Sequence, residues 1–133
     1  MGLCEIVGYA NEVIVYYDND SYVYSKDSIE FDTIINSFND MCLLSKEMPA
    51  FGVSLHNETI NAITSGLWVE FVFDKAYSYN EMSFDSLLIN VDKNFNGFNI
   101  IRKHEGQYSG RCFYIDLFDN DMSSFYDTVT SIN

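Results

Sequence analysis

Alternating hydrophobic and polar residues near the start of the chain predict a β-hairpin. Residues 12–26, EVIVYYDNDSYVYSK, contain two runs of β-branched and aromatic residues around Asp-Asn-Asp-Ser. With Asn19 and Asp20 at the tip, Tyr17 would pair with Tyr22. The polar tip of this hairpin is predicted to be exposed.

The same alternation predicts a series of further strands. Residues 67–73, 87–91, 97–103 and 111–118 each place hydrophobic side chains at every second position. Residues 50–55, AFGVSL, are also predicted as a strand. The short turns between the later segments are typical of an antiparallel meander. The side chains predicted to face the core are Leu67, Val69, Phe71, Phe73, Leu87, Ile89, Val91, Phe98, Ile100, Phe113, Ile115 and Leu117.

Two segments have helical periodicity. The first is predicted to start at Asp27, as the N-cap of a capping box with Glu30, and to end before Pro49. The second lies in residues 120–132, with Asn120 or Asp121 as its cap. Residues 56–66 fit either a short helix or a loop. The apolar stripes are Phe31, Ile34, Ile35, Phe38, Met41 and Cys42 in the first helix, and Met122, Phe125, Val129 and Ile132 in the second.

These elements predict an α+β fold made of a single domain, residues 1–133. The length fits one domain. We expect a twisted, mainly antiparallel sheet of about five to seven strands, with the two helices packed on one face.

The other face of this sheet combines aromatic rings with carboxylates, as the hairpin tip does. Such a mixture is typical of protein-binding surfaces, although it is also compatible with ordinary buried strands. The residues predicted to share that face are Trp68, Glu70, Val72, Leu88, Asn90, Asp92, Tyr114, Asp116 and Phe118.

The charge of the chain narrows the choice of partner. There are 20 acidic and 7 basic residues, for a formal net charge of −13. Residues 1–40 contain eight acidic residues and one basic residue, and residues 114–133 contain four acidic residues and no basic one. A negative electrostatic field of this size repels nucleic acid and anionic lipid and attracts cationic partners. The alternative is that the charge serves only to keep the protein soluble.

Cysteine content and the N-terminal sequence favour a cytoplasmic protein. The three cysteines are far apart and odd in number, so no disulfide framework is predicted. The N-terminal residues lack the basic and apolar regions of a signal peptide, and no stretch has transmembrane length.

The motifs for metal binding are incomplete. A calcium loop starting at Asp18 or Asp119 would have Ile29 or Thr130 where glutamate is required. His56 and His104 have no ligand partner at i+3 or i+4. We therefore expect no metal and no cofactor.

One cluster has residue types used in catalysis. His104 and Cys112 flank the turn EGQYSG, with Glu105 and Arg111 close by. No second motif supports this cluster, so we expect these residues to be structural and the protein not to be an enzyme.

In size, charge and segments such as YYDNDSYVY, GLWVEFVFD and RCFYIDLFDND, the chain resembles small acidic bacterial immunity proteins. These proteins block toxins of the contact-dependent inhibition, polymorphic-toxin and colicin classes. The resemblance implies one cognate toxin domain, held through acidic and aromatic contacts that cover its active site.

The sequence therefore predicts a non-enzymatic protein that binds a cognate basic toxin, most simply a nuclease. Alternatives are a phage-encoded nucleic-acid mimic that inhibits a host defence nuclease, a small enzyme centred on His104 and Cys112, and a structural protein joined through its sheet edges. The oligomeric state is left open. The predicted partner-binding residues are Tyr17, Asp18, Asp20, Tyr22, Trp68, Glu70, Tyr114 and Asp116.

Overall fold

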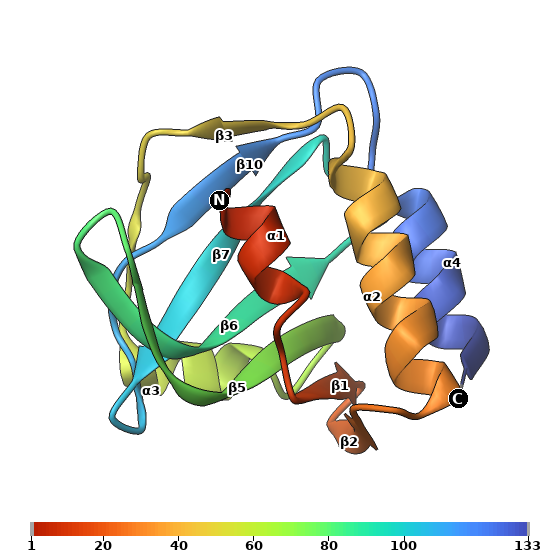
Figure 1. Ribbon diagram of the computed structural model, residues 1–133, viewed down its shortest axis with the longest axis horizontal. Coiled ribbons are helices and arrows are strands. Elements are labelled where there is room, and N and C mark those ends of the chain that lie inside the picture. The colour runs from red at the N-terminus through yellow and green to blue at the C-terminus, as the bar shows by residue number, and fades with distance from the viewer. Residues whose placement is uncertain (1, 133) are drawn as a thin grey trace.

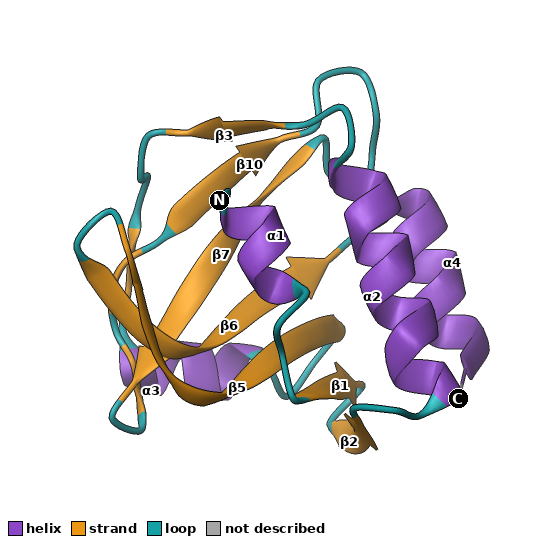
Figure 2. Cartoon of the chain, viewed as in Figure 1, coloured by secondary structure: helices purple, strands orange, loops and turns teal. Residues whose placement is uncertain are grey.

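A twisted antiparallel sheet with helices packed on it forms the framework, in a computed structural model that describes residues 2–132 (Figures 1 and 2). The helices are α1 (Leu3–Val7), α2 (Ile29–Cys42), α3 (His56–Ala62) and α4 (Ser123–Ile132). The strands are β1 (Glu12–Tyr17), β2 (Asp20–Ser25), β3 (Lys46–Met48), β4 (Val53–Ser54), β5 (Leu67–Tyr79), β6 (Met82–Val91), β7 (Gly97–His104), β8 (Gln107–Tyr108), β9 (Gly110–Arg111) and β10 (Phe113–Asp116).

The strand order confirms the predicted α+β class and the meander. The main sheet has eight strands in the order β2-β1-β5-β6-β7-β10-β3, with β8 paired to β7. Every pairing in it is antiparallel, and β4 and β9 form a separate small pair. Within residues 2–132, no helix combines the length and apolar character needed to cross a bilayer.

The core lies between the sheet and a layer formed by α1, α2 and α4 (Figure 1). All twelve strand side chains predicted to face the core are buried. The ring of Phe38 on α2 lies 4.9 Å from that of Phe71 on β5 and 5.9 Å from that of Phe125 on α4. These aromatic contacts join the two long helices to the sheet.

The hairpin forms as predicted, but its register differs by two residues. Asp18 and Asn19 have φ angles of 50° and 74°, so they form the turn, and Tyr17 pairs with Asp20 rather than with Tyr22. Two consecutive left-handed residues produce the twist that a two-residue hairpin requires. Since side chains alternate with a period of two, this shift leaves every residue on its predicted face.

The cap of α2 is Ser28, so the prediction of Asp27 was wrong. The Ser28 hydroxyl accepts a 3.1 Å hydrogen bond from the Phe31 N–H. Asp27 has a φ angle of 80° and lies before the cap. At α4, the Asp121 carboxylate accepts the Ser123 N–H at 3.0 Å, as one of the two predicted caps should.

Some elements were absent from the sequence prediction or extend beyond it. The ambiguous segment 56–66 contains α3, and the strand predicted over 50–55 is reduced to β4. Neither α1 nor β3 was predicted. The buried side chains of α1, Leu3, Ile6 and Val7, close the core beside α2.

Candidate protein-binding site

Trp68 on β5 lies between two surface hollows. Its indole Nε1–H donates a 2.9 Å hydrogen bond to the Ser65 carbonyl oxygen, which fixes the half-buried ring. Trp68 and Asn90 line both hollows, so the two form one continuous surface. We call it the Trp68 surface and define it by Tyr17, Asp18, Trp68, Asn90, Asp92, Phe95 and Tyr114.

The first hollow lies at the end of the sheet and has a volume of about 650 Å³. Tyr17 and Asp18 enter it from the hairpin, because the Asp18 N–H donates a 3.0 Å hydrogen bond to the Gly66 carbonyl oxygen. A hydrogen bond with Tyr126 raises the pKa of Tyr17 above its ordinary value. This end of the surface therefore combines aromatic rings with exposed carboxylate.

One lysine lines the first hollow, and it is already paired. Lys93 Nζ lies 3.1 Å from Asp127 Oδ1 and 5.0 Å from the centre of the Tyr126 ring. The Asp92 carboxylate on the same wall accepts the Asn94 N–H at 2.9 Å. The paired lysine offsets little of the negative field of Asp18 and Asp92.

The second hollow is more apolar and has a volume of about 410 Å³. Phe95 and Tyr114 flank Trp68 there, and the exposed Phe51 ring lies 6.2 Å from that of Tyr114. The Tyr114 hydroxyl lies over the backbone of Gly97, where a side chain would meet it at 2.6 Å. Gly97 thus leaves room for a ring that extends the aromatic surface.

The structure brings some of the predicted binding residues together and separates others. Tyr17, Asp18, Trp68 and Tyr114 all line the Trp68 surface. Asp116 follows Tyr114 on the same face, but its carboxylate accepts the Phe118 N–H at 2.9 Å.

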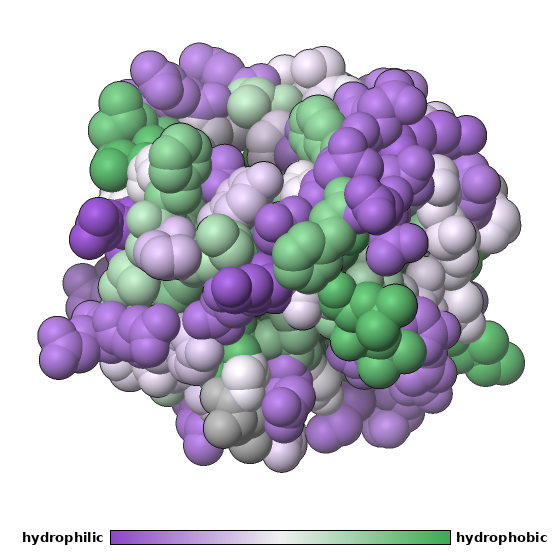
Figure 3. Space-filling view, turned by 90° about the horizontal axis from the view of Figure 1, so that it is seen from above, coloured by the Kyte–Doolittle hydropathy of each residue, from purple (hydrophilic) through white to green (hydrophobic). Residues whose placement is uncertain are grey.

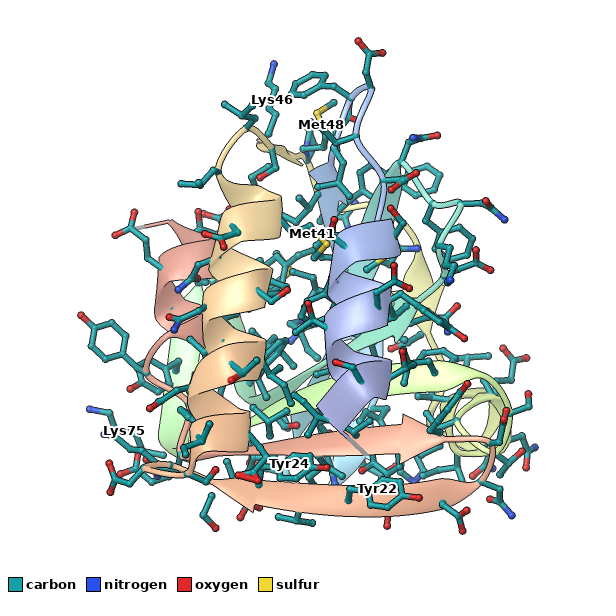
Figure 4. The ribbon with its side chains drawn as sticks, turned by 90° about the vertical axis from the view of Figure 1, so that its right-hand side faces the viewer. Tyr22, Tyr24, Met41, Lys46, Met48 and Lys75 are labelled. Atoms are coloured by element: carbon teal, nitrogen blue, oxygen red, sulfur yellow. The ribbon has the colours of Figure 1, made fainter. Side chains whose placement is uncertain are left out.

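The other two hairpin residues lie on β2. Asp20 is exposed opposite Tyr17. Tyr22 and Tyr24 lie on the side of the hairpin that faces α2 and α4, as Figure 4 shows. Tyr22 shares this face with Tyr17, but it lines neither hollow, so the structure does not place it in the Trp68 surface.

Glu70 is not exposed, which corrects the expectation for this residue. Only 1% of its surface is accessible, and it is the one buried carboxylate among residues 2–132. Its carboxylate oxygens accept hydrogen bonds from the hydroxyls of Tyr16 at 2.7 Å, Ser86 at 2.5 Å and Tyr108 at 2.7 Å. Three donors satisfy the buried charge, so Glu70 has a structural role.

Strand β8 and helix α3 cover Glu70. The Tyr108 N–H donates to His56 Nδ1 at 3.0 Å, and the two rings stack with their centres 5.8 Å apart. Burial raises the pKa values of Tyr16 and Tyr108, and the negative charge of Glu70 raises them further. Both phenols therefore remain hydrogen-bond donors.

A signal for this buried cluster was present in the sequence. Glu70 is the one charged residue within LWVEFVF, a segment otherwise apolar enough to be buried on both faces. Its partners come from three other strands, so sequence spacing could not identify them.

The structure gives no geometric support to the alternative of an enzyme centred on His104 and Cys112. No hydrogen bond or ion pair joins His104 to Cys112 within residues 2–132. Burial raises the pKa of the Cys112 thiol, which is unfavourable for a nucleophile. His104 Nε2 lies 3.6 Å from Glu105 Oε1, and this glutamate is exposed. Within the described chain, no three of the histidine, cysteine and acidic side chains lie close enough to bind one metal ion.

Most of the negative charge is displayed on the surface. Among residues 2–132, Lys93–Asp127 is the one ion pair of a lysine or arginine with a carboxylate, and His104 lies beside Glu105. On the end of the molecule seen in Figure 3, hydrophobic groups are interspersed with hydrophilic ones.

Comparisons with protein families, curated proteins and solved structures find no match to this chain.

Proposed function

We propose that this chain is a non-enzymatic binding protein for a basic protein partner. In the form that we favour, it is a cytoplasmic immunity protein that neutralises a cognate bacterial toxin by covering its active site. The observation that carries the proposal is the Trp68 surface, where a fixed indole lies between two hollows beside Asp18 and Asp92.

The composition of this surface suits a protein partner. Tryptophan and tyrosine provide large, rigid contact area and dominate the energetics of many interfaces. Trp68 loses little freedom on binding, because its indole is already held by Ser65. The apolar second hollow can accept an apolar side chain of the partner, and the first hollow, beside the carboxylates, can accept a basic side chain.

The displayed charge suits a basic partner in particular. Complementary fields raise association rates by roughly 10–10³-fold, which matters when the target is lethal to the cell. A nuclease needs a cationic cleft to hold phosphate. Carboxylates at Asp18 and Asp92 can occupy such a cleft in place of the substrate.

The test begins with capture of the partner. The tagged chain is used as bait in native host lysate at low salt, and the bound protein is identified and expressed alone in cells. We expect a basic protein that is toxic alone and harmless when co-expressed with this chain. A captured phage-defence nuclease would instead favour the nucleic-acid mimic, and a non-basic partner would overturn the proposal.

Charge-reversal variants locate the contact. Asp18→Lys with Asp20→Lys should weaken binding and protection strongly, since a reversed charge repels a basic cleft. Asp32→Lys with Asp40→Lys, on the exposed side of α2, is the matched control with the same net change. If both variants lose binding and protection equally, the loss comes from the change in net charge and not from the hairpin tip.

A further pair of variants tests the enzyme alternative. His104→Ala and Cys112→Ser should each leave protection intact. Loss of protection in both, with unchanged melting temperatures, would favour catalysis.

A further inference from the structure

Two cysteines that are distant in sequence lie beside each other in the structure. Cys4 is on α1 and Cys42 is the last residue of α2, and both are half-buried. Both line the same surface hollow, about 600 Å³ in volume, between the two helices. The fold therefore provides a dithiol that sequence spacing did not suggest.

The two thiols interact directly. A hydrogen bond from the Cys42 thiol lowers the pKa of the Cys4 thiol, and the same contact raises the pKa of Cys42. The nearby carboxylates of Glu5 and Glu47 oppose ionisation of Cys4. Cys4 is thus the more readily ionised partner, and Cys42 supplies the proton donor beside it.

We propose that Cys4 and Cys42 form an oxidisable pair that closes to an intramolecular disulfide when the chain meets a peroxide. Cys4 as thiolate attacks one peroxide oxygen, the O–O bond breaks, hydroxide leaves and takes up a proton to become water, and Cys4 becomes a sulfenic acid. The sulfur of Cys42 then attacks the sulfur of Cys4 and displaces the hydroxyl as water. In sum, two thiols and one hydrogen peroxide give one disulfide and two waters, with the peroxide reduced.

Cys112 provides an internal control for this chemistry. It is 4% exposed and is held beside Ser54 and Arg102, with no cysteine next to it among residues 2–132. Its thiol is buried and lacks a partner for a disulfide. A reaction that depends on the paired geometry should leave Cys112 reduced.

The disulfide would join α1 covalently to the C-terminal end of α2. The closed loop would span residues 5–41, including the β1–β2 hairpin. Restricting that loop in the unfolded chain raises stability. The pair lies in the helical layer, away from the Trp68 surface, so this inference stands independently of the proposed function.

The test uses the folded wild-type chain and dilute hydrogen peroxide. After treatment, free thiols are alkylated under denaturing conditions, and the chain is analysed by intact mass and peptide mapping. We expect one alkyl group, on Cys112, and a cross-linked pair of peptides containing Cys4 and Cys42. The melting temperature should rise by roughly 5–15 °C and return to its original value with dithiothreitol.

Variants identify the order of the steps. Cys42→Ser should leave Cys4 as a sulfenic acid that dimedone traps, whereas Cys4→Ser should not react at residue 42. Three alkylated thiols in the treated wild-type chain would overturn the proposal. So would a cross-link through Cys112, or oxidation of Cys4 to sulfinic acid with Cys42 still free.

Discussion

The hydroxyl of Tyr108 lies 2.7 Å from the carboxylate of Glu70, and this contact ties β8 to β5 on the face opposite α2 and α4. The carboxylate is charged and buried, so each of its donors carries more weight than a donor at the surface. Together with the backbone pairing of β8 with β7, this contact holds β8 and the neighbouring α3 against the sheet.

Tyr108→Phe should therefore destabilise the fold. Loss of a hydrogen bond to a charged group costs about 1.5–3 kcal/mol of unfolding free energy. The measurement is urea denaturation, with Tyr9→Phe as the control because Tyr9 is exposed. If both variants match the wild type within about 0.5 kcal/mol, Tyr108 does not stabilise Glu70 as described.

Stability should also fall in alkaline solution. The pKa values of Tyr16 and Tyr108 are raised in the folded chain, so above about pH 10 the unfolded chain ionises first. The unfolded state then binds fewer protons, and the unfolding free energy declines by at most about 1.4 kcal/mol per pH unit for each group. Below pH 10 this contribution is fully present.

The matched variant for the alkaline decline is Tyr16→Phe with Tyr108→Phe. Its unfolding free energy should fall less steeply between about pH 10 and pH 11. Part of the slope should remain, because burial also raises the pKa values of Tyr24 and Tyr79. An unchanged slope in the double variant would contradict this assignment.

Trp68→Ala should weaken binding to the captured partner by about 2 kcal/mol or more. The indole lies where the two hollows meet, so its removal affects both. Titration calorimetry measures the loss, and Tyr9→Ala removes an exposed ring elsewhere as the control. An intact affinity in a folded Trp68→Ala variant would exclude this surface.

Salt should slow association with the partner more than it changes dissociation. Exposed charges are screened beyond about 8 Å at physiological ionic strength, which weakens steering. Stopped-flow measurements at a series of salt concentrations give the dependence of the association rate constant on salt. If the association rate constant does not change with salt, the net charge of −13 serves solubility and not recognition.

Gly97→Ala should destabilise the chain by roughly 1–3 kcal/mol. A Cβ atom at this position would lie 2.6 Å from the Tyr114 hydroxyl oxygen and 2.8 Å from the Ile115 carbonyl oxygen. Gly2→Ala is the control, since its nearest contact would be 3.8 Å away. Thermal melts compare the two, and equal melting temperatures would show that the Tyr114 side chain and the Ile115 backbone both adjust without cost.

The fold was largely predictable because its signals are local. Alternation identified Phe71 and Ile89 as core residues, and helical spacing identified Phe38. The hairpin register was not predictable, since Asp18 and Asn19 form the turn without the glycine that usually marks it. Ser28 and Asp27 are adjacent and equally good caps, so the sequence could not decide between them.

The binding surface was only partly predictable. Trp68 and Tyr114 were assigned to one face by alternation, and both do line the surface. Burial of Glu70 depends on Tyr108, which reaches it through a tertiary contact and is itself held by His56. The pairing of Cys4 with Cys42 likewise depends on how α1 packs against α2, and α1 was not predicted from its five residues.

Strand β2 forms one edge of the sheet, with no further strand on its outer side within residues 2–132. Such an edge can serve as a template for strands of other molecules, and the exposed Val23 adds an apolar contact. Near neutral pH, mutual repulsion between highly charged molecules keeps these edges apart. Acidification neutralises the carboxylates and removes that barrier, so the colloidal stability of concentrated solutions depends on the same charge that we assign to recognition.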